Sequence, residues 1–190
     1  MVKRLLVAVF LILFFCTATL KSQTGNSNTI DVILSGYSAK MFTTIPVSDG
    51  QIDQVIKCGM KAPSGRNMQP WKFTVVKDNA MVKEVIPTIT SGNILIIVSG
   101  VEAKQPGMSS DFDCALATEN MYVAAQSLGL GAHIYMSPVA NINTKLKPVL
   151  GIPDGYNAVA ILRIGNIDKN VDATSSASTR KKLEEVVTYK

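Results

Sequence analysis

The sequence is poor in the residues on which most metal and acid–base sites are built. Its 190 residues include one histidine and three cysteines, and no Cys-x-x-Cys pair is present. A histidine-based metal cluster within one chain is therefore excluded, and dithiol exchange and structural zinc have no support. The GxxxxGKS/T, GxSxG and HExxH motifs are also missing, and no GxGxxG follows a predicted strand. The common nucleotide and hydrolase sites are not indicated.

The chain also lacks a large excess of either sign of charge. The formal net charge is +5, and removal of a leader that carries Lys3, Arg4 and Lys21 lowers it to about +2. The chain has no block of lysines and arginines and few aromatic residues, so it offers little to a phosphate backbone, and nucleic acid is not an expected partner. With 47% hydrophobic and 17% charged residues, the composition indicates one packed globular domain.

The first 22 residues have the pattern of a secretory signal peptide. Positive charges near the start precede an apolar run over 5–16, which is too short to span a bilayer. Cleavage is expected after Ser22, with Ala18 as the alternative site, and a lipid-bearing Cys16 is a less favoured interpretation. We therefore expect an exported protein, periplasmic or associated with the envelope, that meets the membrane only through its signal peptide.

The remaining chain, from about residue 30 to 190, is predicted to be one α+β domain with a small mixed or antiparallel sheet flanked by helices. Apolar residues at helical spacing predict helices over 49–61, 111–128 and 139–150. Short β-branched runs predict strands over 73–76, 94–98, 132–136 and 158–164. The tail over 180–190 is expected to pack against another surface, because its apolar residues would otherwise be exposed.

The single histidine and the two cysteines beyond the leader are predicted to be structural. His133 lies between apolar residues of a strand pattern, where a hydrogen-bonded structural histidine is commoner than a catalytic base. Cys58 and Cys114 lie in helical patterns. Export permits a disulfide between them, but two buried thiols that act as small hydrophobes are the preferred interpretation.

One loop stands out, APSGRNMQPW over 62–71, between a predicted helix and a predicted strand. Its prolines, glycine and asparagine make it rigid, and Trp71 gives the next strand an apolar anchor. Such a loop can bind the polar edge of a planar heteroaromatic ring. An ordinary helix-to-strand connection is the competing interpretation, and composition alone favours it because turns are rich in these residues.

Together with this loop, four further stretches resemble the nitroreductase family of FMN-dependent oxidoreductases. They are SGYSAKMF over 35–42, ENMYVAAQSLGLG over 119–131, GIPDGYNAVAILRIG over 151–165 and STRKKLEEVV over 178–187. The stretches follow one another in the family's order from about residue 32 to the C-terminus. This order makes the resemblance far more specific than any single string.

The resemblance implies a nitroreductase-like fold and a homodimer with two FMN molecules at the subunit interface. It assigns contacts with the phosphate, the ribityl chain or the flavin ring to Ser38 and Lys40. It assigns the loop that lines the flavin from the partner chain to Pro63, Ser64, Gly65 and Asn67. Of these, Asn67 is expected to serve the pyrimidine edge of the ring as a side-chain donor and acceptor.

The same resemblance places a second loop beside the flavin N5, formed by Tyr135, Met136 and Ser137. A backbone N–H at that point stabilises the negative charge that develops on the reduced flavin. Gly36 stands where the family has a phosphate-binding arginine. This departure leaves Arg180, which matches a C-terminal phosphate ligand, as the chief remaining countercharge of the phosphate.

The activity implied is the transfer of a hydride from NAD(P)H, through FMN, to a nitroaromatic, a quinone or a similar small aromatic acceptor in a ping-pong cycle. No side chain is assigned a catalytic role, because the flavin carries the chemistry. Two alternatives stay open. One is an exported flavin-binding or scavenging protein without turnover, since nicotinamide donors are scarce outside the cytoplasm. The other is a specialised member of the same fold that consumes reduced flavin.

Overall fold

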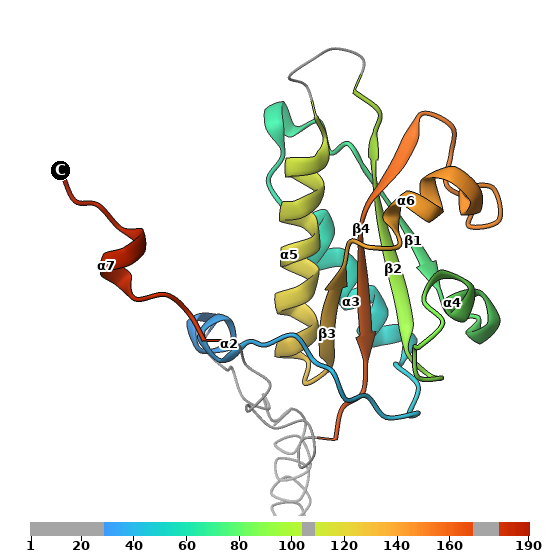
Figure 1. The fold of residues 1–190 in the computed structure, drawn as a ribbon, viewed down its shortest axis with the longest axis horizontal. Helices are drawn as coiled ribbons and strands as arrows, with labels where there is room; N and C mark the ends of the chain where they lie inside the picture. The colour runs from blue at the N-terminus through green and yellow to red at the C-terminus, as the bar shows by residue number, and fades with distance from the viewer. Residues whose placement is uncertain (1–28, 104–108, 169–178) are drawn as a thin grey trace, which may run out of the picture.

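The computed structural model describes residues 29–103, 109–168 and 179–190, and Figure 1 shows their arrangement. One sheet contains the strands β1 (Trp71–Val76), β2 (Ile94–Val101), β3 (Gly131–Tyr135) and β4 (Tyr156–Gly165). Their order across the sheet is β1-β2-β4-β3, and each neighbouring pair is antiparallel. The predicted α+β class with a small antiparallel sheet is confirmed.

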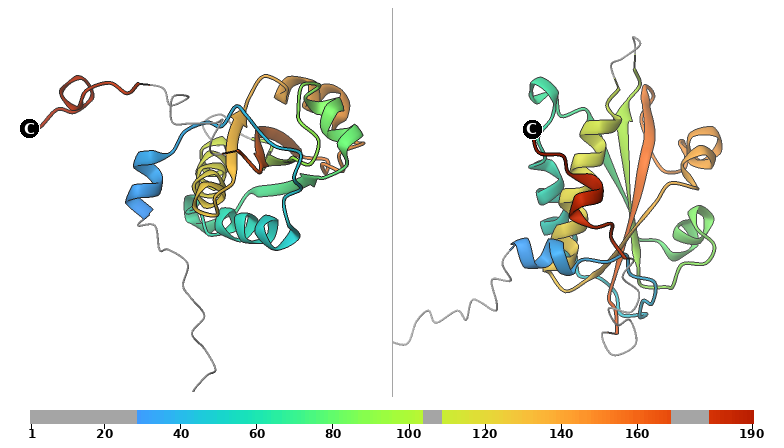
Figure 2. Two further views of the ribbon diagram at one scale, coloured as in Figure 1. Left: turned by 90° about the horizontal axis from the view of Figure 1, so that it is seen from below. Right: turned by 60° about the vertical axis from the view of Figure 1, so that its left-hand side comes forward.

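Helices cover both faces of this sheet (Figure 1). On one face lie α3 (Asp49–Met60) and α5 (Asp111–Ser127). On the other face lie α4 (Asn79–Val85), α6 (Val139–Asn141) and the helical turn η2 (Ile142–Leu146). Two short helices, α2 (Thr29–Ser35) and α7 (Leu183–Val186), lie outside these layers in Figure 1 and in the left view of Figure 2.

The alternation of side chains along β2 separates two hydrophobic cores. Ile96 and Val98 pack in the core beneath α3 and α5, whereas Leu95 and Ile97 pack in the core beneath α4 and η2. All four side chains are fully buried, and full burial of one such side chain contributes about 1.5 to 3 kcal/mol. Because β2 is covered on both faces, its sequence is a continuous apolar run, which is what makes it recognisable as a strand.

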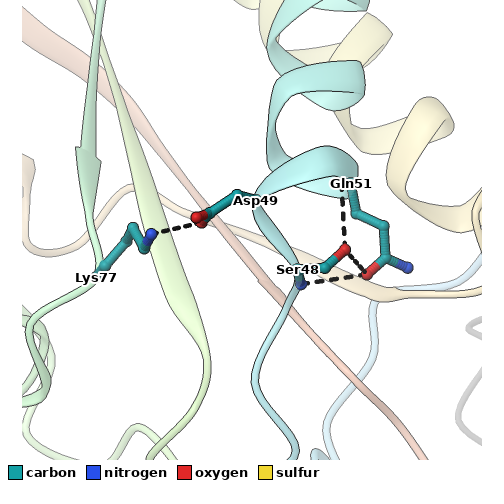
Figure 3. A network of polar contacts seen from close by, with 4 residues as sticks. All are labelled: Ser48, Asp49, Gln51 and Lys77. Atoms are coloured by element: carbon teal, nitrogen blue, oxygen red, sulfur yellow. Dashed lines mark hydrogen bonds and ion pairs between the residues drawn. The ribbon is translucent and has the colours of Figure 1, made fainter.

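Helix α3 begins at a capping box beside the end of β1 (Figure 3). The Ser48 hydroxyl accepts a hydrogen bond from the Gln51 backbone N–H, and the Gln51 side chain accepts one from the Ser48 N–H. Close by, Lys77 Nζ lies 2.5 Å from Asp49 Oδ1. Because both members of this ion pair are exposed, it adds little stability, and the capping residues determine where the helix begins.

The helix predicted over 139–150 is confirmed as far as Leu146, but it is not a regular α-helix. α6 ends at Asn141, and η2 is a π-helical turn in which the Lys147 N–H donates to the Ile142 carbonyl oxygen at 3.0 Å. The Asn143 side chain there bonds both the N–H and the carbonyl oxygen of Ala158 in β4, at 2.7 and 3.0 Å. Pro148 then has no N–H with which to continue a helix.

Two short helices, α2 and α4, lie where the sequence patterns predict none. α4 begins after Asp78, whose side chain accepts a hydrogen bond from the Met81 N–H, and it buries only Val82 and Val85. α2 buries no residue at all. With so few buried positions, apolar spacing has no length over which to show a helical period.

The burial predicted for the two cysteines and the packing predicted for the tail have different outcomes. Cys114 is buried as predicted, but Cys58 is exposed, because the buried stripe of α3 runs through Ile52, Val55 and Gly59. The tail finds no packing surface among the described residues, since Leu183 and Val186 are 63% and 62% exposed. Its packing against another surface stays a prediction.

The predicted signal peptide over 1–22 lies outside the described residues. Ile30, the expected start of the domain, falls in the first turn of α2. Within 29–103, 109–168 and 179–190, no helix has both the length and the apolar character needed to cross a membrane.

Candidate functional site

The segment 36–43 runs past the start of β3 and is held there by its backbone. The Ala39 N–H donates to the Ala132 carbonyl oxygen at 3.0 Å. Gly131 permits this close approach, because a Cβ at that position would lie 2.8 Å from Ala39 Cβ and 3.0 Å from the Phe42 ring. The path of the segment is thus determined by a small residue in the strand beside it.

Ser38 and Lys40 are exposed on either side of the buried Ala39. Ser38 Oγ lies 3.5 Å from the hydroxyl of Tyr122, which projects from α5. Lys40 forms no ion pair with any residue of the described ranges. The segment therefore presents a hydroxyl and an uncompensated ammonium group to the solvent, and this donor set suits an anion.

His133 fastens the same segment to β3. Its Nδ1 lies 2.9 Å from the Ala39 carbonyl oxygen, and its ring is tilted against that of Tyr135 with 4.5 Å between centroids. The hydrogen bond predicted for this histidine is confirmed. Because it contacts a residue between Ser38 and Lys40, it also helps to determine where those two side chains lie.

Neighbouring atoms fill the space that a side chain at position 36 would need. A Cβ there would lie 2.8 Å from Gln126 Oε1 and 3.1 Å from the Val32 carbonyl oxygen. Gln126 Oε1 instead accepts a hydrogen bond from the Tyr37 N–H at 3.3 Å. A larger residue at position 36 has to displace this contact. The end of α2 and the end of α5 therefore meet where the family has a phosphate-binding arginine.

The second predicted loop begins where β3 ends, at Tyr135. Met136 and Ser137 follow in an exposed turn, which the Val139 N–H closes by donating to the Met136 carbonyl oxygen at 3.1 Å. The backbone N–H of Ser137 has no acceptor among the residues that the structure describes. It is therefore free to donate a hydrogen bond to a ligand.

Arg163 on β4 is a buried cation that the motif analysis does not single out. It is 6% exposed, and it donates from Nε to Asn93 Oδ1 at 2.8 Å and from Nη1 to the Tyr135 hydroxyl at 3.4 Å. Its guanidinium carbon lies 3.7 Å from the centroid of the Phe42 ring. No carboxylate of the described residues pairs with it. The signal that points to it in the sequence is a lone charge within the apolar run 158–164.

The loop over 63–69 is anchored to the first turn of α5. Both carboxylate oxygens of Asp113 lie within hydrogen-bond distance of the Gly65 N–H, at 3.2 and 3.3 Å. The short helical turn η1 (Gly65–Asn67) follows, and Pro63, Gly65 and Asn67 are exposed while Ser64 is partly buried. The four loop residues that the resemblance names therefore lie together on the surface.

One chain does not bring all the predicted residues to one place. The loop is anchored at Asp113 and Ser38 contacts Tyr122, and these two residues of α5 are about 14 Å apart along the helix axis at 1.5 Å per residue. Arg180 is exposed near the start of the third described range. The site thus falls into two groups, one around β3 and the other at the N-terminal end of α5.

Comparison with known proteins places these residues in a family. The Nitroreductase family pattern matches residues 33–97 and 94–166. A relative from Archaeoglobus fulgidus, named as an NADH dehydrogenase or NAD(P)H nitroreductase, is 32% identical over 145 residues, which cover 72% of this chain and 83% of that protein. The NADPH-flavin oxidoreductase of Vibrio harveyi is 26% identical, with 76% of this chain and 68% of that protein covered.

A solved structure agrees with these sequence relatives. An FMN-dependent nitroreductase from Clostridium difficile R20291 is 25% identical to this chain and superposes with a TM-score of 0.67. The superposition covers 87% of this chain and 100% of the other. The fold and the sequence thus lead to the same set of proteins.

Proposed function

Because this chain belongs to the nitroreductase family, we propose that it is an FMN-dependent oxidoreductase that takes a hydride from NAD(P)H and reduces a small aromatic acceptor in a ping-pong cycle. The expected acceptors are nitroaromatics and quinones. The names of two relatives bear out the oxidoreductase class and the FMN cofactor that the sequence predicts. The observation that carries the proposal is a pair of exposed donors with no acceptor among the described residues, the Lys40 ammonium group and the Ser137 N–H.

These donors fit FMN in charge and in kind. The Lys40 ammonium group and the Ser38 hydroxyl suit a phosphate dianion, and Arg180 adds a second cation suited to it. The Ser137 N–H suits the part of the ring where negative charge develops on reduction. Within the described residues, the site offers no carboxylate cluster that would repel the phosphate or hold a metal.

When bound, FMN supplies the hydride chemistry, which no side chain of this protein can provide. The residues around it bind and orient. Lys40, Ser38 and Arg180 hold the phosphate, Ser137 directs its N–H at the ring, and Met136 offers an apolar surface that is 59% exposed. His133 bonds the 36–43 segment at Ala39, and Arg163 bonds Tyr135 at the start of the second loop, so these two residues hold the binding segments in place.

We also propose that the site is completed by a second copy of the chain. The 63–67 loop and the β3 group lie apart within one chain, and the resemblance assigns the loop to the flavin of the partner, so we take the loop in each site from the second copy. The exposed apolar side chains of α2 and α7 agree with this, because Leu34, Leu183 and Val186 are at least 62% exposed here. A partner surface would also cover the tail.

Mixing two defective variants tests this sharing. One chain carries Lys40→Ala with Arg180→Ala, and the other carries Asn67→Ala. If the site takes residues from both chains, each mixed dimer holds one site with only wild-type residues. Random mixing in equal amounts then restores about a quarter of the wild-type FMN sites. Binding no better than the average of the two variants means that each site lies within one chain.

Steady-state oxidation of NADH and NADPH with menadione or nitrofurazone tests turnover. Ping-pong kinetics predict parallel lines in double-reciprocal plots when the acceptor concentration is varied. Intersecting lines contradict the ping-pong order but not the activity. A protein that holds FMN and yet oxidises neither nicotinamide, with either acceptor, is a flavin-binding or scavenging protein instead.

Export is proposed on the residues 1–22 alone. The positive start, the apolar run over 5–16 and the small residues after it support removal of a signal peptide. We expect the protein purified from its host's envelope or periplasm to begin near Gln23. An intact Met1 in the cytoplasmic fraction contradicts export and leaves the proposed activity standing, because the residues that carry that activity lie after Ser35.

A further inference from the structure

The 63–69 loop holds its backbone in a conformation that L-residues rarely adopt. Arg66, Asn67 and Gln69 have φ values of 52°, 57° and 47°. Such residues persist only where surrounding bonds over-determine the backbone. Here the Gln69 N–H donates to Ser64 Oγ at 3.0 Å, and the Asn67 N–H donates to the Ser64 carbonyl oxygen at 3.0 Å. The loop is exposed and nevertheless held in one shape.

Within this loop the side chains of Gln69 and Asn67 are hydrogen-bonded to each other. Gln69 Nε2 donates to Asn67 Oδ1 at 3.2 Å. An asparagine amide has one acceptor oxygen and an NH2 group with two donors. Because Gln69 uses the oxygen, the Asn67 NH2 group is the part that remains open, and it has no acceptor among the described residues. Asn67 is exposed, so this donor faces outward.

We propose that Gln69 is a positioning residue that sets the polarity of Asn67, so that the loop offers bound FMN a hydrogen-bond donor and not an acceptor. The inference rests on the proposed function. A donor at this place selects the carbonyl oxygens and the unprotonated ring nitrogen of the flavin pyrimidine. It also favours the reduced flavin, because negative charge gathers on those atoms. Gln69 acts on the flavin only through the amide of Asn67.

Gln69→Glu tests this directly, because a carboxylate can only accept. The Asn67 amide then has to turn its NH2 group toward residue 69 and its oxygen outward. We expect FMN to bind about tenfold more weakly, and the midpoint potential of the bound flavin to become more negative. Gln69→Met, which neither donates nor accepts, is expected to give a smaller change in both. Met68→Glu is the matched control, because it adds the same charge to the same exposed loop without reaching that amide.

A double-mutant cycle separates positioning from a structural effect. In an Asn67→Ala background, Gln69→Glu should change neither the FMN dissociation constant nor the potential by more than Met68→Glu does. An equal loss with and without Asn67 contradicts the proposal, and so does a Gln69→Glu protein that matches Met68→Glu throughout. Melting temperatures of the flavin-free variants show whether each one folds, and Gln69→Met carries the cycle if the glutamate variant does not.

The wild-type protein in the same titration distinguishes this inference from the proposed function. If it binds FMN and NAD(P)H reduces the flavin, a normal Gln69→Glu variant overturns only the role of Gln69. If the wild-type protein ignores FMN, the proposed function fails, and the positioning role fails with it.

Discussion

The guanidinium carbon of Arg163 lies 3.7 Å from the centroid of the Phe42 ring, and this contact joins strand β4 to the 36–43 segment. The same guanidinium donates to Asn93 and to the Tyr135 hydroxyl. One buried side chain therefore holds both segments that we assign to FMN. A planar group with five donors and a stackable face can do this, and an ammonium group cannot.

Arg163→Lys should consequently be more damaging than Arg163→Met. Lysine keeps a buried charge but loses the stacking and at least one of the two hydrogen bonds, and we expect a loss of about 2 to 4 kcal/mol in the free energy of unfolding. Methionine loses the same contacts but removes the cost of burying a charge. Urea denaturation of the flavin-free proteins measures both. A lysine variant as stable as the wild type means that the guanidinium contacts contribute nothing.

Asp113→Ala should loosen the 63–69 loop, because it removes the acceptor of the Gly65 N–H. Asp111→Ala is the control, since it takes the same charge from the same turn of α5 and leaves the loop bond intact. Hydrogen exchange followed by mass spectrometry should show about a five- to tenfold faster exchange in loop peptides for Asp113→Ala alone. Equal exchange in both variants indicates a general effect on the helix.

Arg180→Ala should weaken FMN about ten- to a hundredfold, since a lost charged hydrogen bond contributes about 1.5 to 3 kcal/mol. Riboflavin, which has no phosphate, should be affected far less. Lys181→Ala is the neighbouring control for the removal of one positive charge. If riboflavin and FMN weaken equally, Arg180 does not contact the phosphate.

Thiol labelling should distinguish Cys58 from Cys114. Burial first, and then the charges of Asp111 and Asp113, raise the pKa of Cys114 from 9.0 to about 12. In a Cys58→Ser protein, we therefore expect native Cys114 to resist iodoacetamide at pH 9 and to react once the protein is unfolded. Fast labelling of the native variant at that pH contradicts the burial.

The same pKa shift affects stability at alkaline pH. The folded state disfavours the thiolate, so the contribution is fully present below pH 9, where the unfolded thiol is still protonated, and it is lost as the pH rises toward 12. Cys114→Ala should remove this part of the pH dependence. Unchanged alkaline unfolding in that variant means that other groups account for it.

The sequence predicts the strands best where burial covers both faces, as along β2, and it predicts helices best where an apolar stripe is long, as in α3 and α5. It misses α4, whose seven residues bury two side chains. It does not predict the π-helical turn in the helix that begins at Val139, because the bonds from Asn143 to Ala158 join residues that are distant in the chain. Local patterns contain no information on such a contact.

The candidate site shows the same division. Motifs locate the residues that we propose to contact FMN, such as Lys40 and Asn67, since their spacing is local. The residues that hold them in place, Arg163, Asp113 and Gln69, act through contacts that only the folded chain defines. Gln69 lies within the loop over 62–71 that the sequence singles out, but the sequence does not show that its side chain bonds Asn67.

The most direct test of the central claim is the visible spectrum of the purified, FMN-supplemented protein, recorded without oxygen before and after NAD(P)H is added. We predict about one FMN per chain, loss of the oxidised flavin absorbance when NADH or NADPH is added, and its return when menadione follows the removal of the nicotinamide. A colourless protein that ignores FMN, or a bound flavin that neither nicotinamide reduces, contradicts the account.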